Sequence, residues 1–389
     1  MNRHPSTPRK DWQKAVESQG LTYHTVDGHA YWDESAYYEL NEQDAGAIED
    51  AVDALWPMCQ AAVARLIDKG ELNRVGIPGK HHALVAESWR KREPTLYGRF
   101  DFAYDGSGVA KMLEFNADTP TSLVESAVAQ WYWFKDVLPN LDQFNTLHEE
   151  LVKRWGQIAS TRSGPIHFSC MYEMDEDWMT INYLRDCAMQ VGGAGNEGGG
   201  ANPIKTVPIA VEDIGWNARR GIFVDEQEKA ITTIFKLYPW EWMMDEEFAA
   251  NLSGGGASPT TWIEPAWKSV LSSKGILPVL WEMFPNHPNL LEASLTPLAC
   301  DHVVKPMRSR EGCNIKVVRS GQAPVETDGP YDGNLVYQRF VPLRSFDGKT
   351  PTVGGWLVGD KMCGVGIRED ASVITRNTSS FVPHVYVGG

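Results

Sequence analysis

The sequence predicts a mixed fold of the α+β or α/β class, with mixed and antiparallel sheets, flanking helices and more than one subdomain. The chain has 389 residues, which is more than one hydrophobic core usually holds, so two or three subdomains are expected. Alternating apolar and polar residues over 96–118 are followed at once by helical periodicity. The last third of the chain contains β-branched runs separated by glycine and proline, which predicts a mostly antiparallel sheet.

Helices are predicted both before and after the alternating segment. Apolar residues recur at helical spacing over 42–69, which indicates an amphipathic helix with a bend expected at Pro57. The same spacing over 82–93 indicates a second helix. Further along, 165–193 has the pattern of a strand, an acidic loop and a helix, which is typical of an α/β unit.

A β-hairpin is predicted over 96–118, because its alternation breaks once at 105–108 and then resumes. A four-residue turn there would place Arg99 opposite Glu114 and Asp101 opposite Met112. One face would then carry apolar side chains able to pack into a core: Phe100, Phe102, Leu113 and Phe115.

The other face of the hairpin carries the candidate metal ligands. Residues two apart on a strand point to the same side, so four polar side chains come together: Arg99, Asp101, Glu114 and Asn116. Two carboxylates and an amide oxygen on rigid strands suit Mg²⁺, and an arginine beside them suits phosphate or carboxylate. The alternative is a solvent-exposed face held by an arginine–glutamate pair across the strands.

A helix is expected to start directly after the hairpin. Pro120 fits the first turn of a helix capped by Thr119, and Ser122 with Glu125 offers a capping box as an alternative. Either start would aim free backbone N–H groups at the same neighbourhood. Metal, arginine and helix start together favour phosphate transfer.

Two glycine-rich segments, 192–203 and 253–259, are expected to be loops or lids. Neither ends in the GK[ST] pattern of a phosphate-binding loop. A mobile lid would keep water away from a reactive intermediate, and a plain surface insertion explains the glycines equally well.

Composition limits the partners. The net charge of −15 argues against a nucleic-acid partner, and it suits either simple solubility or the steering of a cationic substrate such as a polyamine. No apolar run approaches the ~18 residues of a membrane span, and the first residues lack the apolar core of a secretory signal. Six scattered cysteines without a CxxC pair indicate reduced thiols and no zinc site. We therefore expect a cytoplasmic protein with no membrane partner, whose oligomeric state the sequence leaves open.

Five motifs in the same order resemble the synthetase domain of the glutathionylspermidine synthase family, over roughly 22–385. They are "YGRFDFAYDG", "LEFNADTPTSLVE", "KGILPVLWEMFPNH", "VVKPMRSREGCNI" and "VGIRED". That family consists of ATP-grasp-type carboxylate–amine ligases, so the resemblance implies an ATP-grasp-like fold and ATP with Mg²⁺ as cofactors.

The resemblance also implies roles for individual residues. The magnesium ligands would be Asp101, Glu114 and Asn116. The catalytic arginines would be Arg99, which would also contact the phosphates of ATP, and Arg368. The remaining ATP contacts would be Lys274, Lys305, Glu311, Gly312, Gln338, Arg339, Phe340 and Val341. Contacts to the acid and amine substrates would be Thr119, Thr121, Glu176 and Asp177.

In this interpretation one ATP-grasp unit spans 1–389. Residues 1–160 would form helices and the metal-binding hairpin, 161–265 an α/β substrate subdomain, and 266–389 an antiparallel ATP-binding sheet. The nucleotide would lie between two sheet-containing subdomains.

The reaction implied is the joining of a carboxylate, such as that of glutathione or another peptide, to an amine, such as a polyamine, through an acyl phosphate. The bifunctional members carry an amidase domain for which this chain has no room, so amide hydrolysis is not expected. The loop "KPMRSREGCNI" differs from that of the bifunctional enzymes and resembles the single-domain relatives, whose substrates need not be glutathione and spermidine. Two other functions stay open: an ATP-binding regulatory protein and a small-molecule kinase.

Overall fold

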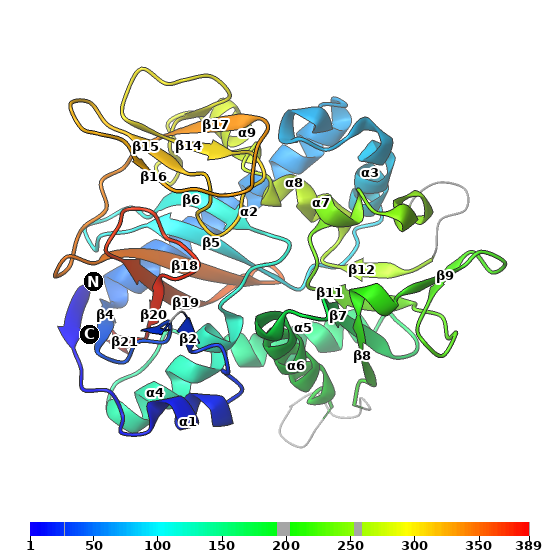
Figure 1. Cartoon of the computed structure of the whole chain (residues 1–389), viewed down its shortest axis with the longest axis horizontal. Helices are drawn as coiled ribbons and strands as arrows, with labels where there is room; N and C mark the ends of the chain where they lie inside the picture. The colour runs from blue at the N-terminus through cyan, green and yellow to red at the C-terminus, as the bar shows by residue number, and fades with distance from the viewer. Residues whose placement is uncertain (27, 193–202, 253–258, 389) are drawn as a thin grey trace.

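Helices surround several sheets in the computed structural model, which describes residues 1–26, 28–192, 203–252 and 259–388 (Figure 1). The glycine-rich segments predicted as loops or lids fall largely outside these ranges. The described residues form two five-stranded sheets, one four-stranded sheet and three smaller ones. No helix in these ranges is both long and apolar enough to cross a membrane. The fold is therefore mixed α and β, as the sequence predicted.

An antiparallel sheet lies at the centre of the molecule, with the strand order β20-β19-β18-β5-β6 (Figure 1). Its strands are β5 (Tyr97–Ala103), β6 (Lys111–Asn116), β18 (Thr350–Val358), β19 (Lys361–Asp370) and β20 (Ser380–Val382). The predicted hairpin is thus present as β5 and β6. It shares its sheet with strands from the last third of the chain, because β5 pairs with β18 and Asp101 lies opposite Gly354.

The predicted helices beside this sheet are confirmed. The first, α2 (Glu42–Asp68), continues through Pro57 and starts at a capping box in which Asn41 and Asp44 bind each other's backbone N–H groups. The second is α3 (His82–Arg90). Two short helices, α8 (Ser269–Ser272) and α9 (Ile276–Met283), also pack against α2.

One face of the central sheet is apolar and packs on α2. Phe100 and Phe102 belong to the same buried cluster as Val52 of the helix. A Cβ atom on Gly355 would lie 3.1 Å from both Phe102 and Val52, so the glycine lets helix and sheet approach. Because side chains alternate along a strand, the polar residues of the hairpin face the other way.

The register of the hairpin differs from the predicted one. Asp101 lies opposite Glu114, and Arg99 lies opposite Asn116. The prediction had placed Met112 opposite Asp101 and Glu114 opposite Arg99. The four polar residues still share one face, because the error is an even number of positions.

A bulge and a longer turn explain the difference. The connection between the strands has seven residues, 104–110, and the Asn289 side chain holds it through the carbonyl of Ala110 at 2.9 Å. The pairing then slips by one position, so that Met112 is buried in the core and Leu113, predicted for the core face, lines a cleft instead. A contact with residue 289 is not visible in local alternation.

A second antiparallel sheet, with the order β13-β17-β14-β15-β16, lies beside β6 (Figure 1). Its strands are β13 (Ala293–Ser294), β14 (His302–Pro306), β15 (Lys316–Val318), β16 (Val325–Glu326) and β17 (Leu335–Arg339). The antiparallel strands predicted for the last third are therefore confirmed, but they divide between this sheet and the central one.

A parallel sheet with the order β12-β11-β7-β8 forms the other end of the molecule (Figure 1). Its strands are β7 (Ile166–Cys170), β8 (Thr206–Ala210), β11 (Thr233–Lys236) and β12 (Thr261–Ile263). One face packs on α5 (Leu147–Ala159) and α6 (Asp175–Met189). The predicted strand, acidic turn and helix over 165–193 are confirmed, although three acidic residues placed in the loop form the first turn of α6.

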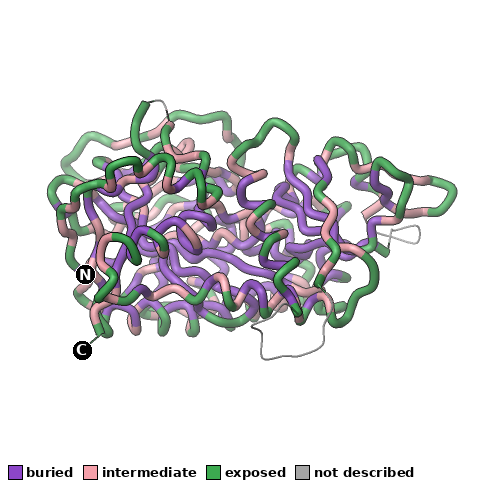
Figure 2. Tube along the Cα trace, turned by 90° about the horizontal axis from the view of Figure 1, so that it is seen from below, coloured by how far each residue is buried: buried purple, intermediate pink, exposed green. Residues whose placement is uncertain are grey.

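Smaller elements complete the fold. A three-stranded sheet joins β1 (Asn2–Pro5), β4 (Ala36–Asn41) and β21 (His384–Val387), and two hairpins join β2 (Thr25–Val26) to β3 (His29–Ala30) and β9 (Gly215–Asn217) to β10 (Ile222–Val224). Short helices are α1 (Trp12–Ser18) and α7 (Trp240–Met243). Buried residues run continuously through the interior and exposed ones line the outside (Figure 2). The division of the chain into three subdomains stays a prediction.

The helix predicted to start near Thr119 starts later. Helical structure begins at Leu123, passes through a π-helical turn (Glu125–Ala129) and continues as α4 (Gln130–Val137). Ser122 has a φ of +66°, and its hydroxyl bonds to the Tyr31 hydroxyl at 2.9 Å instead of capping the helix. Thr119 accepts a hydrogen bond from Arg310. Tertiary contacts therefore hold the residues before Leu123 in a non-helical path.

Candidate functional site

A cleft of about 810 Å³ lies between the central sheet and the second antiparallel sheet. The polar face of the β5–β6 hairpin reaches it through Asp101 and Glu114. It is also lined by every remaining residue predicted to contact ATP, apart from Arg99: Lys274, Lys305, Glu311, Gly312, Gln338, Arg339, Phe340 and Val341. The structure thus brings together segments that lie up to 240 residues apart in the chain.

The four polar residues of the hairpin contact one another. The Arg99 guanidinium donates two hydrogen bonds to the Asp101 carboxylate, from Nε to Oδ1 at 2.6 Å and from Nη2 to Oδ2 at 3.0 Å. The Asn116 amide nitrogen donates to Asp101 at 2.9 Å and lies 3.4 Å from Glu114 Oε1. The predicted alternative, an arginine–glutamate pair on a solvent-exposed face, is wrong, because Arg99 pairs with Asp101 and both residues are buried.

These donors suit a hard cation. Among the described residues, no group of three or more histidine, cysteine, aspartate or glutamate side chains could hold a metal ion. The hairpin instead offers two carboxylates and one amide, whose oxygen faces them after rotation about the terminal side-chain bond. Mg²⁺ usually takes one or two carboxylates and completes its shell with substrate phosphates and water. Asp101, Glu114 and Asn116 therefore fit Mg²⁺ better than zinc.

Two buried lysines lie over the carboxylates. Lys274 Nζ lies 3.1 Å from Glu114 Oε2 and donates to the Ser309 carbonyl at 2.7 Å. Lys305 Nζ donates to the Gln338 side chain at 2.8 Å and to the Leu113 carbonyl at 3.1 Å.

Burial and charge set the protonation of this group. Burial raises the pKa of Glu114, but Lys274, Lys305 and Arg99 outweigh it and lower that pKa to about 2. Burial lowers the pKa of Lys305 to about 8, and Glu114 only partly opposes this. Near neutral pH the cleft therefore holds an ionised glutamate beneath cationic groups, which suits an anionic ligand.

The outer part of the cleft is apolar, a feature that the sequence interpretation did not identify. Its walls are formed by Val303, Ile315, Val317, Phe340, Val373 and Ile374. Gln338 lies between these walls and Lys305, with its amide nitrogen bonded to the Met112 carbonyl at 3.1 Å. Arg339 contributes little there, because its side chain is 53% exposed and pairs with Glu292. Such a slot suits a flat base with a polar edge.

Arg368 lies next to this cleft. A smaller cavity of about 300 Å³ is lined by Arg99 and Arg368, and it shares Asp101, Thr352 and Thr375 with the first. Arg368 donates to the carbonyls of a turn at 376–379. Its Nε atom is buried and has no hydrogen-bond partner in the described ranges. Both predicted catalytic arginines therefore reach one cavity that opens beside Asp101.

Glu176 and Asp177 line neither cavity, but their charges act on the same neighbourhood. Burial, together with the charges of Glu125 and Asp177, raises the pKa of Glu176 to about 8. Burial also raises the pKa of Asp177 to about 7, which Arg310 opposes.

Glu125 joins this acidic group, although the sequence suggested only a helix cap there. It is fully buried, and burial raises its pKa. Neither of its carboxylate oxygens has a hydrogen-bond donor in good geometry among the residues that the structure describes, although the nearby Tyr31 hydroxyl lowers its pKa. A buried carboxylate without a donor is costly, so Glu125 is a candidate partner for a cationic ligand. Nothing in local sequence distinguishes it from an ordinary helical glutamate.

Thr119 and Thr121 lie on the loop after β6 and line neither cavity. Thr119 Oγ1 accepts from Arg310 Nη1 at 2.7 Å, and the Thr121 carbonyl accepts from Arg99. Arg310, which the sequence interpretation missed, also pairs with Glu241 of α7. The loop is therefore tied to both Arg99 of β5 and the segment after β14.

Known proteins resemble this chain over most of its length. The family model described as "glutathionylspermidine synthase preATP-grasp" matches residues 3–387. A candidate acid–amine ligase from Haemophilus influenzae is 39% identical, over 97% of this chain and 98% of its own length.

Two relatives from Crithidia fasciculata are more distant. A trypanothione synthetase is 29% identical over 82% of this chain, and a glutathionylspermidine synthase is 25% identical over 90%. This chain spans 52% and 58% of their respective lengths. The match across almost the whole sequence shows that the chain belongs to the glutathionylspermidine synthase preATP-grasp family.

Proposed function

We propose that this chain is an ATP- and Mg²⁺-dependent ligase that joins a carboxylate to an amine through an acyl phosphate. One observation carries the proposal. The cleft combines an apolar slot, buried lysines and an oxygen-rich hairpin, and its lining includes most of the residues that the family resemblance assigned to ATP and Mg²⁺. The relatives named as acid–amine ligases and synthetases support the same reaction class.

The chemistry requires activation. A carboxylate does not condense with an amine at neutral pH, because its oxygen is a poor leaving group. In the first step a carboxylate oxygen attacks the γ-phosphorus of ATP, the bond to the bridging oxygen breaks, and ADP leaves. In the second step the neutral amine attacks the acyl carbon, inorganic phosphate leaves with the bonding electrons, and the nitrogen loses a proton. The products are an amide, ADP and phosphate.

The first step brings two anions together, so the residues act mainly by positioning and electrostatics. Lys274, Lys305 and Arg368 would cover the charge that develops on the transferred phosphoryl group. Arg99 would orient Asp101 and contact the same phosphate. Mg²⁺ bound at Asp101, Glu114 and Asn116 would neutralise negative charge on the phosphate oxygens.

The nucleotide would lie between the two antiparallel sheets. The base would enter the apolar slot beside Gln338, Arg339, Phe340 and Val341, with the phosphates toward the lysines. The loop with Glu311 and Gly312 would cover them. Gly312 has a φ of +69°, and a Cβ atom there would lie 2.2 Å from the Thr375 carbonyl, so only glycine fits.

The acid and the amine would bind on the side of the second cavity. Thr119, Thr121 and Arg310 would contact the acid, which the names of the relatives suggest is a thiol peptide such as glutathione. Glu125, Glu176 and Asp177 would hold the ammonium groups of a diamine or polyamine. We place the activity in the cytoplasm, which is supported by the six cysteines, all of them described and all free.

A screen of peptides and polyamines for ADP release, with product masses measured, tests the function. We expect release that requires both an acid and an amine, glutathione with spermidine among the pairs tried. Release with an alcohol alone would indicate a kinase. ATP binding without turnover over the whole panel would indicate a regulatory protein.

Replacing Glu114 with alanine should remove Mg²⁺-dependent ATP turnover, because Asp101 and Asn116 alone cannot hold the metal. We expect a loss on the order of 10²–10³ or more in rate, as for other charge contacts. The measurement is ADP release as a function of Mg²⁺, with folding checked by circular dichroism. Asp105→Ala, in the turn of the same hairpin, is the matched control and should keep its activity. A well-folded Glu114→Ala protein with normal turnover contradicts the assignment.

Replacing Lys305 with methionine should weaken the binding of a non-hydrolysable ATP analogue about tenfold or more, since a buried cation facing the phosphates is lost. Titration calorimetry measures this. Lys111→Met removes a lysine from β6, outside the cleft, and should leave the affinity unchanged. Equal affinities for the two variants would rule out contact between Lys305 and the nucleotide.

Amine affinity should rise with pH. The raised pKa values of Glu176 and Asp177, about 8 and 7, mean that both carboxyls are largely neutral at pH 6 and become charged as the pH increases. A bis-quaternary diamine, whose own charge is fixed, should therefore inhibit about tenfold or more better at pH 8 than at pH 6. Glu176→Gln with Asp177→Asn should flatten this profile, and Glu173→Gln should not. A flat wild-type profile excludes these carboxylates from the amine site.

A further inference from the structure

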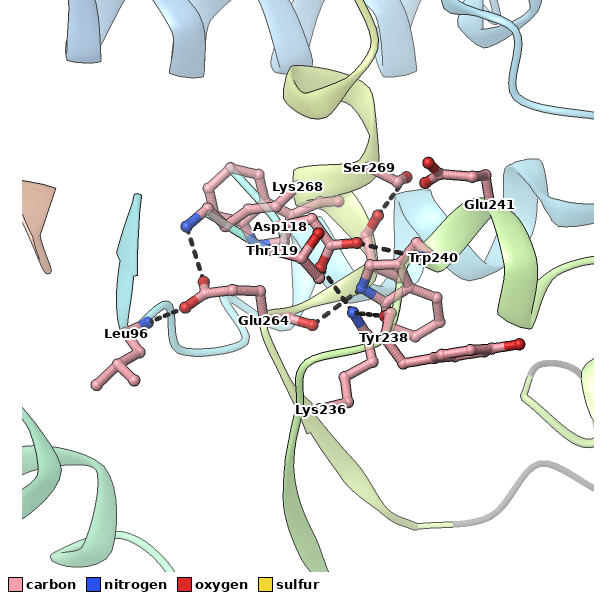
Figure 3. Close-up of polar contacts among 12 residues, drawn as sticks. Leu96, Asp118, Thr119, Lys236, Tyr238, Trp240, Glu241, Glu264, Lys268 and Ser269 are labelled. Carbon is pink, nitrogen blue, oxygen red and sulfur yellow. Dashed lines mark hydrogen bonds and ion pairs between the residues drawn. The ribbon is translucent and has the colours of Figure 1, made fainter. Parts of the chain in front are cut away.

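Two buried ion pairs lie between the candidate site and the parallel sheet (Figure 3). Lys236 Nζ donates to Asp118 Oδ1 at 2.6 Å, and Lys268 Nζ donates to Glu264 Oε2 at 2.8 Å. None of the four side chains is more than 1% exposed. Charges at this depth are tolerated only when they are paired and hydrogen-bonded. Each pair therefore fixes the chain segments that carry it.

The pairs hold the two ends of the β5–β6 hairpin. Glu264, directly after β12, accepts from the backbone N–H groups of Leu96 and Tyr97 at 2.8 and 2.9 Å, where β5 begins. Asp118 lies two residues beyond the end of β6, and its partner Lys236 is the last residue of β11. The open end of the hairpin, where β5 begins and β6 ends, is thus anchored to the parallel sheet.

Asp118 also closes a ring of contacts with the substrate side of the site. Its second oxygen accepts from the backbone N–H of Trp240, the first residue of α7, at 2.8 Å. The next residue, Glu241, pairs with Arg310. Arg310 in turn donates to Thr119 at 2.7 Å, and Thr119 follows Asp118 in the chain. The ring joins the loop after β6, α7 and the loop after β14.

Trp240 contacts one residue of each ion pair (Figure 3). Its indole N–H donates to the Glu264 carbonyl at 2.9 Å, and its ring centre lies 4.8 Å from Lys236 Nζ. Lys236 also donates to the Tyr238 carbonyl at 2.9 Å. With these contacts Lys236 has little room to follow Asp118 if that residue moves, so the direction of the carboxylate is fixed.

We infer that Asp118, held by Lys236 and Trp240, is a positioning residue that fixes Thr119 and Arg310 for the acid substrate. Asp118 does not itself line the nucleotide cleft. The loop that it begins is fixed at its far end by Arg99, which donates to the Thr121 carbonyl. Loss of Asp118 leaves this loop held at one end only. The role of Asp118 in the reaction rests on the proposed function. The coupling between the loop after β6, α7 and the loop after β14 does not depend on it.

Two variants separate positioning from stability. Asp118→Asn keeps an oxygen for the Trp240 N–H but leaves Lys236 unpaired, so it should lower the urea midpoint of unfolding. Adding Lys236→Met removes the orphaned charge, and the midpoint should return toward the wild-type value. Glu264→Gln with Lys268→Met is the matched control, since it removes a buried pair of the same kind outside the ring.

The first measurement is hydrogen exchange. In the Asp118→Asn/Lys236→Met protein we expect the backbone amides of the non-proline residues in 117–122 and 306–312 to exchange about tenfold or more faster than in the wild type. The control variant should leave 306–312 unchanged. Wild-type exchange at 306–312 in the Asp118 double variant overturns the inference, whatever reaction the protein catalyses.

The second measurement is kinetic, with glutathione and spermidine as probes. In the Asp118 double variant kcat/KM for glutathione should fall about 10²-fold, as expected for misplaced substrate contacts. The affinity for a non-hydrolysable ATP analogue should stay within about twofold. Recovery of kcat/KM together with the urea midpoint would show a purely structural role and overturn the inference. If the wild type has no activity with any acid and amine pair, the proposed ligase function fails, while the exchange measurement still decides the role of Asp118.

Discussion

The two facing carboxylates of the central hairpin must be neutralised, and this requirement determines how the surrounding segments are placed. Asp101 and Glu114 lie opposite each other on neighbouring strands, an arrangement that is unfavourable without compensation. Arg99 compensates from the same strand, and Lys274 from a distant segment. Because buried charge must be neutralised, the central sheet and the segments that carry the lysines require each other. A metal ion with a polyphosphate would let the same lysines change partners without leaving an unpaired charge.

This dependence explains the arrangement of the sheets. The central sheet presents its apolar face to α2 and its polar face to the second antiparallel sheet. Neither sheet alone makes a cleft, since Lys305 and Gln338 of one bind the carbonyls of Leu113 and Met112 in the other. The bulge at Leu113 contributes directly, because it turns an apolar side chain out of the core and into the wall of the cleft.

Period-two alternation was sufficient to predict the hairpin and the shared face of Arg99, Asp101, Glu114 and Asn116. It could not give the register, which depends on a contact between the turn and Asn289. It also could not give the start of the following helix, because tertiary contacts of Thr119 and Ser122 keep those residues out of the helix. The acidic group around Glu125 joins residues from two separate helical segments, so no local pattern reveals it. The predicted ATP contacts came from family resemblance, which carries information that spacing lacks.

Burying an ion pair, as at the edge of the parallel sheet, is not in general the most stabilising use of an interior position. Well-packed apolar residues often replace a buried pair at no cost, and an apolar contact tolerates a shift of one side chain against another. A carboxylate that accepts from both a lysine and a backbone N–H does not tolerate such a shift, because hydrogen bonds weaken steeply as the donor–hydrogen–acceptor angle departs from a straight line. Asp118 therefore gives the loop after β6 a fixed direction. A reaction that must align an acid with a phosphoryl group depends on that direction more than on additional stability.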